Sequence, residues 1–139
     1  MLFRSRMGDP EAESVIPRIK SDLLGLFRAV GQGTLAEESI ETDPRFATAI
    51  MLVSGGYPGS YEKGKTIDGL GQVSGSMVFH AGTREDSSGK VLTNGGRVLA
   101  VSSYGESLED ALRSSYVNAS LIEFEGKYYR RDLGTDLKD

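Results

Sequence analysis

Hydrophobic residues recur every three or four positions in two parts of the chain, and this spacing predicts two amphipathic helices. In the first part the apolar positions run through residues 16–30. Because proline is tolerated only in a first helical turn, regular helix is expected from Pro17 to Val30, and two glycines just beyond end it. The second helix is expected after Ser107, which forms a capping-box pattern with Asp110. Its apolar face comprises Leu108, Leu112, Tyr116, Ala119 and Ile122.

Three further segments have the composition of β-strands. Residues 46–53 are nearly all apolar with β-branched side chains, which predicts a strand buried on both faces. Residues 77–81 and 97–103 are also strand-like, and the polar stretch 82–96 between them suggests a small antiparallel unit. A hairpin turn is expected at residues 125–126. The sequence therefore predicts an α+β fold.

Composition narrows the classes of function. The 139 residues include 16 basic and 20 acidic side chains, so no basic field favours nucleic acid or an anionic membrane as a partner. The chain has no cysteine, which excludes disulfides, thiol nucleophiles and thiolate metal sites. Its single histidine, His80, has no partner motif and is interpreted as structural. No apolar run approaches a membrane span and no signal-peptide core is present, so a cytoplasmic location is expected.

Glycine is unusually frequent, at 18 of 139 residues, and it concentrates in residues 54–71 and 82–96. Glycine-rich loops allow the backbone to approach a ligand closely. Residues 59–66 match the P-loop pattern, with Lys65 and Thr66 at its end. A true P-loop holds phosphate at the start of a helix, but no helical period follows Thr66. A glycine-rich connection between strands is therefore the preferred interpretation.

Other segments could also carry chemistry. Residues 6–13 place a cation and three carboxylates around a turn. Arg6 could hold a carboxylate or phosphate through two hydrogen bonds, and Asp9 could accept or orient an amine proton. A charged, exposed first helical turn is the alternative, and the charge pattern alone favours it. Residues 54–61 and 93–97 offer glycines and polar side chains to a ligand, although a plain hairpin turn explains the second equally well.

Six segments of the chain, taken together, are characteristic of one enzyme family. They are RMGDPEAE at 6–13, PRIKSDL at 17–23, SGGYPGSYEKGK at 54–65, VFHAGT at 78–83, TNGGRVLAV at 93–101 and YRRDLG at 129–134. In these strings, and in their order and spacing, the chain resembles the phosphoribosylamine-glycine ligases, also called glycinamide ribonucleotide synthetases. The resemblance covers nearly the whole chain from Arg6 onward and corresponds to the last third or so of a longer enzyme.

The resemblance implies an ATP-grasp ligase of de novo purine synthesis. In that family ATP, with Mg²⁺, phosphorylates the glycine carboxylate, and the amine of phosphoribosylamine attacks the acyl phosphate. Residues 1–35 would then end the ATP-grasp domain, with its trailing helix. Residues 41–134 would form a small antiparallel barrel-sandwich of the rudiment single hybrid motif type, and 135–139 a tail. The partner of this chain would be the missing N-terminal part of the ligase, and the isolated fragment is expected to be inactive.

The resemblance also implies site residues. Arg6 and Asp9 become the catalytic candidates, with Gly8 and Pro10 beside them, for holding glycine or the acyl phosphate. Two loops become candidates for closing over the phosphoribosyl end of the other substrate. They supply Gly55, Gly56, Tyr57, Pro58, Gly59, Tyr61, Asn94, Gly95, Gly96 and Arg97.

The chain departs from the family pattern at its start. Leu2 and Arg4 stand where the family carries a glutamate and an asparagine as metal ligands, and neither side chain can bind Mg²⁺, so no metal ligand is assigned. Residues 2–5 also read like a translated sequencing adapter, which suggests an assembly junction. Two alternatives remain: a non-catalytic binding or interaction module derived from the ATP-grasp architecture, and a fragment of an ATP-grasp carboxylase, which the RMGDPE string argues against.

Overall fold

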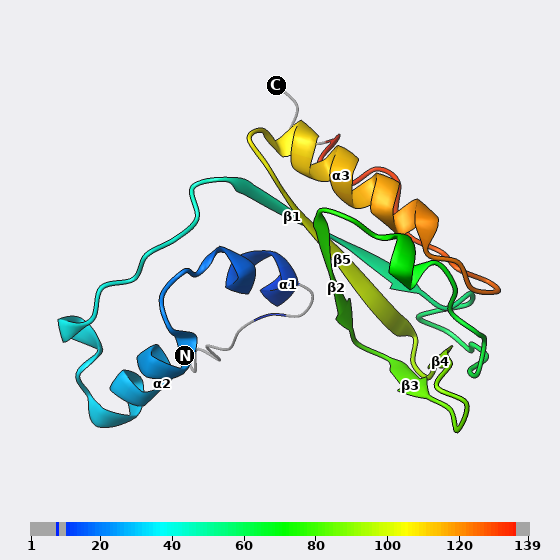
Figure 1. The fold of residues 1–139 in the computed structure, drawn as a ribbon, viewed down its shortest axis with the longest axis horizontal. Helices are drawn as coiled ribbons and strands as arrows, with labels where there is room; N and C mark the ends of the chain where they lie inside the picture. Colours follow the sequence, from blue (N-terminus) through cyan, green and yellow to red (C-terminus); the bar gives the residue numbers. More distant parts are fainter. Residues whose placement is uncertain (1–7, 9–10, 136–139) are drawn as a thin grey trace.

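The computed structural model describes residue 8 and residues 11–135, and it has the predicted α+β composition. Figure 1 shows an arch with two limbs. One limb is an N-terminal arm (residues 11–43) that carries the helices α1 (Ala12–Val15) and α2 (Leu23–Gln32). The other limb is a β-sheet with the helix α3 (Leu108–Leu121) packed along it.

Two antiparallel sheets form within the described residues. The larger has the strand order β1 (Phe46–Val53), β5 (Arg97–Gly105) and β2 (Ser76–His80). Val101 of β5 lies opposite Ile50 of β1 and Val78 of β2, which fixes the register. The smaller sheet pairs β3 (Thr83–Glu85) with β4 (Val91–Thr93). The predicted antiparallel pairing of the two strand-like segments around the polar stretch is thus confirmed.

The central strand β5 is covered on both faces. Val101 belongs to the main core cluster, and the hydroxyl of Ser103 accepts a hydrogen bond from Ser115 of α3, so this face lies beneath the helix. On the opposite face the Ser102 hydroxyl donates to the Glu13 carbonyl of the arm. The fully or largely buried members of the core are Ile50, Leu52, Ile67, Val98, Leu99, Val101, Ala119, Ile122 and Phe124.

Strand β1 has the predicted bounds, but the expectation that both of its faces are buried is wrong. Ile50 and Leu52 are fully buried, whereas Ala49, Met51 and Val53 are only half-buried. The difference arises because α3 covers one face completely while the arm, which contacts β1 through α1, covers only part of the other.

The helix predicted from Pro17 to Val30 is interrupted. Pro17 lies in a short 3₁₀ turn, Ile16–Arg18, after which Ile19 forms an antiparallel bridge with Thr42. The helix α2 starts only after Asp22, whose carboxylate accepts a hydrogen bond from the Leu24 amide at 3.1 Å. Pairing with a distant segment and a good N-cap therefore outweigh the apolar period.

The helix α3 forms as its capping pattern predicts. The Asp110 amide donates to the Ser107 hydroxyl at 3.1 Å, which satisfies one of the free N–H groups of the first turn. At the other end the Lys127 ammonium donates to the carbonyls of Ala119 and Ile122. No helix within the described residues is long and apolar enough to cross a membrane.

The turn expected at residues 125–126 is present, with Gly126 at a φ of 75° and the Lys127 amide bonded to the Phe124 carbonyl. It is not a hairpin, because its flanking residues pair with two different segments. Glu123 bridges Asp68, and Tyr128 bridges Val53 at the end of β1. The turn thus ties the end of the chain to the outer edge of the larger sheet.

A chain of buried hydroxyls joins α3 to all three strands of the larger sheet. The Ser115 hydroxyl lies 3.0 Å from that of Thr48 and donates to that of Ser103 at 2.8 Å. Ser103 in turn lies 2.6 Å from the Ser76 hydroxyl, which accepts a hydrogen bond from the Asn118 amide at 2.7 Å. Because a buried hydroxyl without a partner is costly, these bonds fix the helix in one position.

Replacing Ser115 with alanine should lower the free energy of unfolding by about 1–3 kcal/mol, because Thr48 and Ser103 each lose a buried partner. Urea unfolding at constant m-value measures the change. The control is Ser120→Ala, on the exposed side of the same helix, which should change stability by less than about 0.5 kcal/mol. Equal effects in the two variants would contradict the role of the hydroxyl chain.

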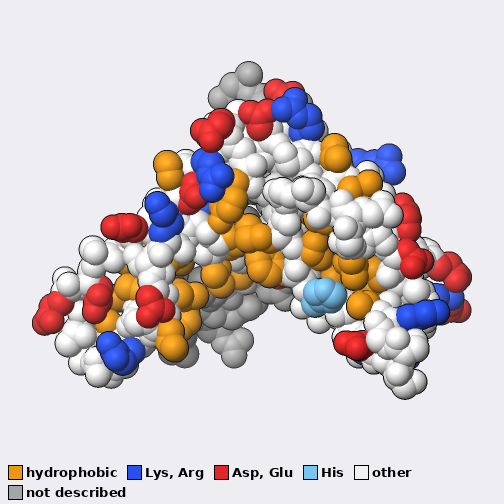
Figure 2. Space-filling view, in the orientation of Figure 1, with side chains coloured by type: hydrophobic (Ala, Val, Ile, Leu, Met, Phe, Trp, Pro, Cys, Tyr) orange, Lys and Arg blue, Asp and Glu red, His pale blue; other side chains and the backbone are white. Residues whose placement is uncertain are grey.

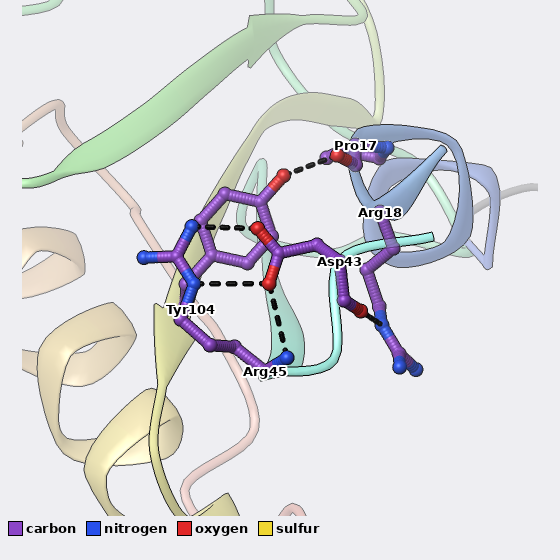
Figure 3. A network of polar contacts seen from close by, with 5 residues as sticks. All are labelled: Pro17, Arg18, Asp43, Arg45 and Tyr104. Carbon is purple, nitrogen blue, oxygen red and sulfur yellow. Dashed lines mark hydrogen bonds and ion pairs between the residues drawn. The ribbon is translucent and has the colours of Figure 1, made fainter. Parts of the chain in front are cut away.

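A polar network holds the arm against the end of the central strand β5, as Figure 3 shows. The Arg45 guanidinium donates two hydrogen bonds to the Asp43 carboxylate, at 3.0 and 2.7 Å, and lies 4.4 Å from the centre of the Tyr104 ring. The Tyr104 hydroxyl donates to the Pro17 carbonyl, and the Arg18 side chain donates to the Asp43 carbonyl. Side-chain and backbone hydrogen bonds from Arg45 hold the pKa of Asp43 well below its usual value of 3.8.

The lowered pKa of Asp43 predicts a pH-dependent contribution to stability. The stabilisation is present above the unfolded-state pKa near 3.8 and is lost as the pH falls through the lower folded-state value. The difference in Tm between the unsubstituted protein and Asp43→Asn should therefore be largest near neutral pH and shrink below about pH 4. Thermal unfolding across this range measures it, with the exposed arm residue Glu38→Gln as control. A difference that is independent of pH would contradict the assignment.

Candidate functional site

The two loops predicted to bind substrate lie together. One begins where β1 ends and the other ends where β5 begins, and Val53 and Arg97 are partners in the sheet. The Ser54 amide donates to the Gly96 carbonyl, and the Ser54 hydroxyl to the Gly95 carbonyl, both at 2.8 Å. The antiparallel pairing of the two strands thus brings two loops that are distant in the sequence into one cluster.

Tyrosine side chains close this cluster. The Arg97 guanidinium donates to the Tyr57 hydroxyl at 3.1 Å, and the rings of Tyr57 and Tyr61 are 6.2 Å apart, centre to centre. A Cβ on Gly96 would lie 2.1 Å from the Tyr57 ring and 3.0 Å from the Tyr61 ring. Gly96 is therefore required for the packing of both tyrosines.

The other loop candidates occupy distinct positions. Gly56 has a φ of 92°, where a side chain would be strained, and a Cβ on Gly55 would lie 2.9 Å from the Gly126 carbonyl. Pro58 follows a cis peptide bond, and Gly59 is exposed next to it. Asn94 is exposed, and its backbone N–H donates to the Gly82 carbonyl at 2.8 Å. Backbone shape accounts for several of these glycines, and ligand binding by the loops stays a prediction.

The plain hairpin turn considered for residues 93–97 does not form. β4, on one side of Asn94, pairs with β3, whereas β5, on the other side, pairs with β1 and β2. The Asn94–Gly96 segment instead carries the chain from the smaller sheet to the larger one. The Asn-Gly signal was misleading because it is local, while strand partners are chosen by the whole fold.

The P-loop lookalike has no phosphate-binding geometry. Thr66 forms an isolated bridge with Leu92, and no α-helix begins directly after it, as the sequence predicts. The Lys65 ammonium lies 2.7 Å from the Glu62 carboxylate and 2.9 Å from that of Glu125. Hydrogen bonds to these two carboxylates raise the pKa of Lys65, so its charge is already balanced within the chain.

The predicted catalytic residues Arg6 and Asp9, together with Pro10, lie outside the described residues, as do Leu2 and Arg4. Gly8 is described and half-buried, and a Cβ there would lie 2.2 Å from the Glu11 carboxylate. The catalytic role of this segment therefore stays a prediction.

Within the described part of the chain, no three His, Cys, Asp or Glu side chains lie close enough together to hold a metal ion.

His80 is exposed, and its Nδ1 lies 2.8 Å from the Thr83 hydroxyl. It is the pale blue side chain in Figure 2, on a face where apolar side chains gather over both limbs. A small hollow of about 220 Å³ between the arm and β2 is lined by Ala12, Glu13, Ile16, Pro17 and Phe79.

A second hollow, of about 330 Å³, is absent from the sequence predictions. It lies between the outer edge of β1 and the C-terminal segment that follows Tyr128. Its lining is Ala49, Met51, Val53, Tyr57, Tyr128, Tyr129, Arg130 and Leu133. The only signal in the sequence is a set of tyrosines in segments far from β1, and their convergence depends on tertiary structure.

Comparisons with known proteins agree with the motifs. The family described as "Phosphoribosylglycinamide synthetase, C domain" matches residues 47–136. The chain is 40% identical to a phosphoribosylamine–glycine ligase of Halalkalibacterium halodurans over 96% of its own length and 31% of that protein. It is 42% identical to the bifunctional purine biosynthetic protein purD of Dictyostelium discoideum, over 95% of the chain and 17% of that protein.

A solved structure is similar as well. The phosphoribosylamine–glycine ligase of Thermotoga maritima superposes with a TM-score of 0.73 at 39% identity, over 91% of this chain and 31% of that one. The chain thus spans about a third or less of the length of these relatives.

Substituting Gly96 with alanine should displace the rings of Tyr57 and Tyr61, break the Arg97–Tyr57 hydrogen bond and cost about 1–3 kcal/mol of stability. Near-UV circular dichroism reports the tyrosines and urea unfolding reports the stability. Gly71→Ala is the matched control, because no atom lies within 4 Å of a Cβ built there. An unchanged tyrosine spectrum in Gly96→Ala would refute the packing role.

Proposed function

The chain belongs to the phosphoribosylglycinamide synthetase family through that family's C domain, and on this premise we propose that it is the C-terminal portion of an ATP-dependent ligase. The reaction proposed is the joining of glycine to 5-phosphoribosylamine, which yields glycinamide ribonucleotide. One observation carries the proposal: about 40% identity over nearly the whole chain to enzymes named phosphoribosylamine–glycine ligase. The convergence of the two predicted substrate loops supports it.

In the proposed reaction ATP phosphorylates the glycine carboxylate, and the amine of phosphoribosylamine then displaces phosphate from the acyl group. Arg6 holds the carboxylate or the acyl phosphate through paired hydrogen bonds. Asp9 orients the attacking amine and accepts its proton. Gly8 and Pro10 are assigned to the same substrate site. The Ser54–Tyr61 and Asn94–Arg97 loops close over the phosphoribosyl end.

ATP and Mg²⁺ are proposed to bind mainly to the preceding part of the enzyme. Leu2 and Arg4 cannot serve as metal ligands, and no residue of this chain is assigned to Mg²⁺. In our proposal residues 1–35 end the ATP-grasp domain, and residues 41–134 form the C-terminal barrel-sandwich domain of the ligase, of the rudiment single hybrid motif type. The proposed location of the enzyme is the cytoplasm. By itself the chain is then inactive, because the nucleotide site is incomplete.

Complementation tests the proposal. The chain should produce no ADP or glycinamide ribonucleotide from glycine, phosphoribosylamine and Mg-ATP when alone, and should do so when mixed with the N-terminal two thirds of a homologous ligase. In the mixture Asp9→Asn should lower the rate by about 100-fold or more. Glu109→Gln, an exposed carboxylate on α3, is the control and should leave the rate unchanged.

Two outcomes would contradict the proposal. The first is stable association of the two parts without turnover. The second is specific binding of this chain to an unrelated protein with no complementation, which would favour a non-catalytic interaction module.

A further inference from the structure

The hollow beside β1 has an unusual back wall, formed by the edge of a strand. At Val53 both the N–H and the carbonyl point away from β5, because they bond with Tyr128 at 2.9 and 3.0 Å. The register shift between Leu52 and Val53 skips Val98 of β5 and adds no residue to β1. Backbone groups therefore still alternate in direction along β1, so the carbonyl of Ala49 and the N–H of Met51 point to the same outer side as those of Val53. Tyr128 is the last residue of the C-terminal segment that pairs with β1 in the described chain. The hollow therefore exposes an acceptor and a donor two residues apart on one edge.

The side walls of the hollow are mainly apolar and aromatic, with Arg130 as the one charged residue in the lining. Met51 and Leu133 contribute flexible aliphatic surface, and Tyr57, Tyr128 and Tyr129 contribute rings from two distant segments. Tyr57 is held by its hydrogen bond from Arg97, so this ring is fixed in place before any ligand binds. Flat rings and a thioether favour a flat, polarisable ligand.

The ends of the hollow limit the length of its occupant. The Val53–Tyr128 pair closes one end. At the other end Tyr116 of α3 anchors the C-terminal segment, since its hydroxyl accepts from the Leu133 amide at 3.1 Å and donates to the Arg130 carbonyl at 3.2 Å. An extended peptide would have to pass through one of these closures, so an added β-strand does not fit. The volume of about 330 Å³ lies at the lower end of the range for small-molecule pockets.

We propose that this hollow binds a planar nitrogen heteroaromatic ring whose edge carries a hydrogen-bond donor next to an acceptor, as in the nucleobases. The donor of the ring bonds to the Ala49 carbonyl, the acceptor receives the Met51 N–H, and the faces of the ring pack against the tyrosines and the Met51 side chain. A base bonds to both exposed backbone groups and also covers the apolar surface. Water can bond to the backbone groups but leaves the apolar surface exposed to solvent. This site does not depend on the proposed ligase function, because binding requires no turnover.

Adenine is the probe, titrated into the isotope-labelled 139-residue chain and followed by amide NMR shifts. Saturable shifts are expected at Ala49, Met51, Tyr128 and Tyr129, with none at the arm residues. N6,N6-dimethyladenine, which lacks the N–H donor, should bind at least about tenfold more weakly, because the Ala49 carbonyl loses its partner.

Ala49→Leu fills the hollow and should weaken adenine binding by at least about tenfold. Ala47→Leu is the matched control, since Ala47 is half-buried on the same face of β1 but lines a groove beside the arm instead. The amide spectra of both variants verify folding. Absence of saturable shifts, shifts centred elsewhere, equal binding of the dimethylated base, or equal losses in the two variants would each overturn the site.

Discussion

The burial of residues 98–103 of β5 is the constraint on which the rest of the structure depends. Residues 98–103 of this strand are buried, so every polar group there needs a partner within the protein. Ser103 finds one in α3 and Ser102 finds one in the arm, on opposite faces of the sheet. Small side chains make this possible, because a helix and an arm can then both approach the strand closely. A small residue is also required at the end of β5, because a Cβ on Gly105 would lie 2.3 Å from the Ala111 amide nitrogen.

The same strand determines where the candidate chemistry lies. β5 begins at Arg97 and pairs there with the end of β1, so the loop after β1 and the segment before β5 must meet. The contacts among Ser54, Tyr57 and Gly96 follow from that pairing. On the arm side, Tyr104 of β5 bonds to Pro17, downstream of the segment proposed to carry Arg6 and Asp9. One strand thus positions the two loops and also contacts the arm.

Local signals in the sequence predicted the elements that local forces decide. The bounds of β1 and the start of α3 follow from an apolar run and a capping box, and both are confirmed. The break after Arg18 was not predicted, because it depends on pairing between Ile19 and Thr42. The hollow beside β1 was also missed, since it forms only where the segment after Tyr128 leaves the strand edge. Arg6 and Asp9 emerged as catalytic candidates through family motifs, because charge pattern alone favoured an ordinary exposed turn.

Native-state hydrogen exchange tests most directly whether β5 joins the arm and the sheet into one cooperative unit. The amides to compare are those of Lys20 and Asp43, which bond to Glu41 and Arg18 within the arm, and that of Val101 in β5. If the burial of β5 on both faces unites the two limbs, the arm amides should open with nearly the same free energy and denaturant dependence as Val101. Exchange of the arm amides that is orders of magnitude faster and insensitive to denaturant would show that the arm opens independently and contradict this account.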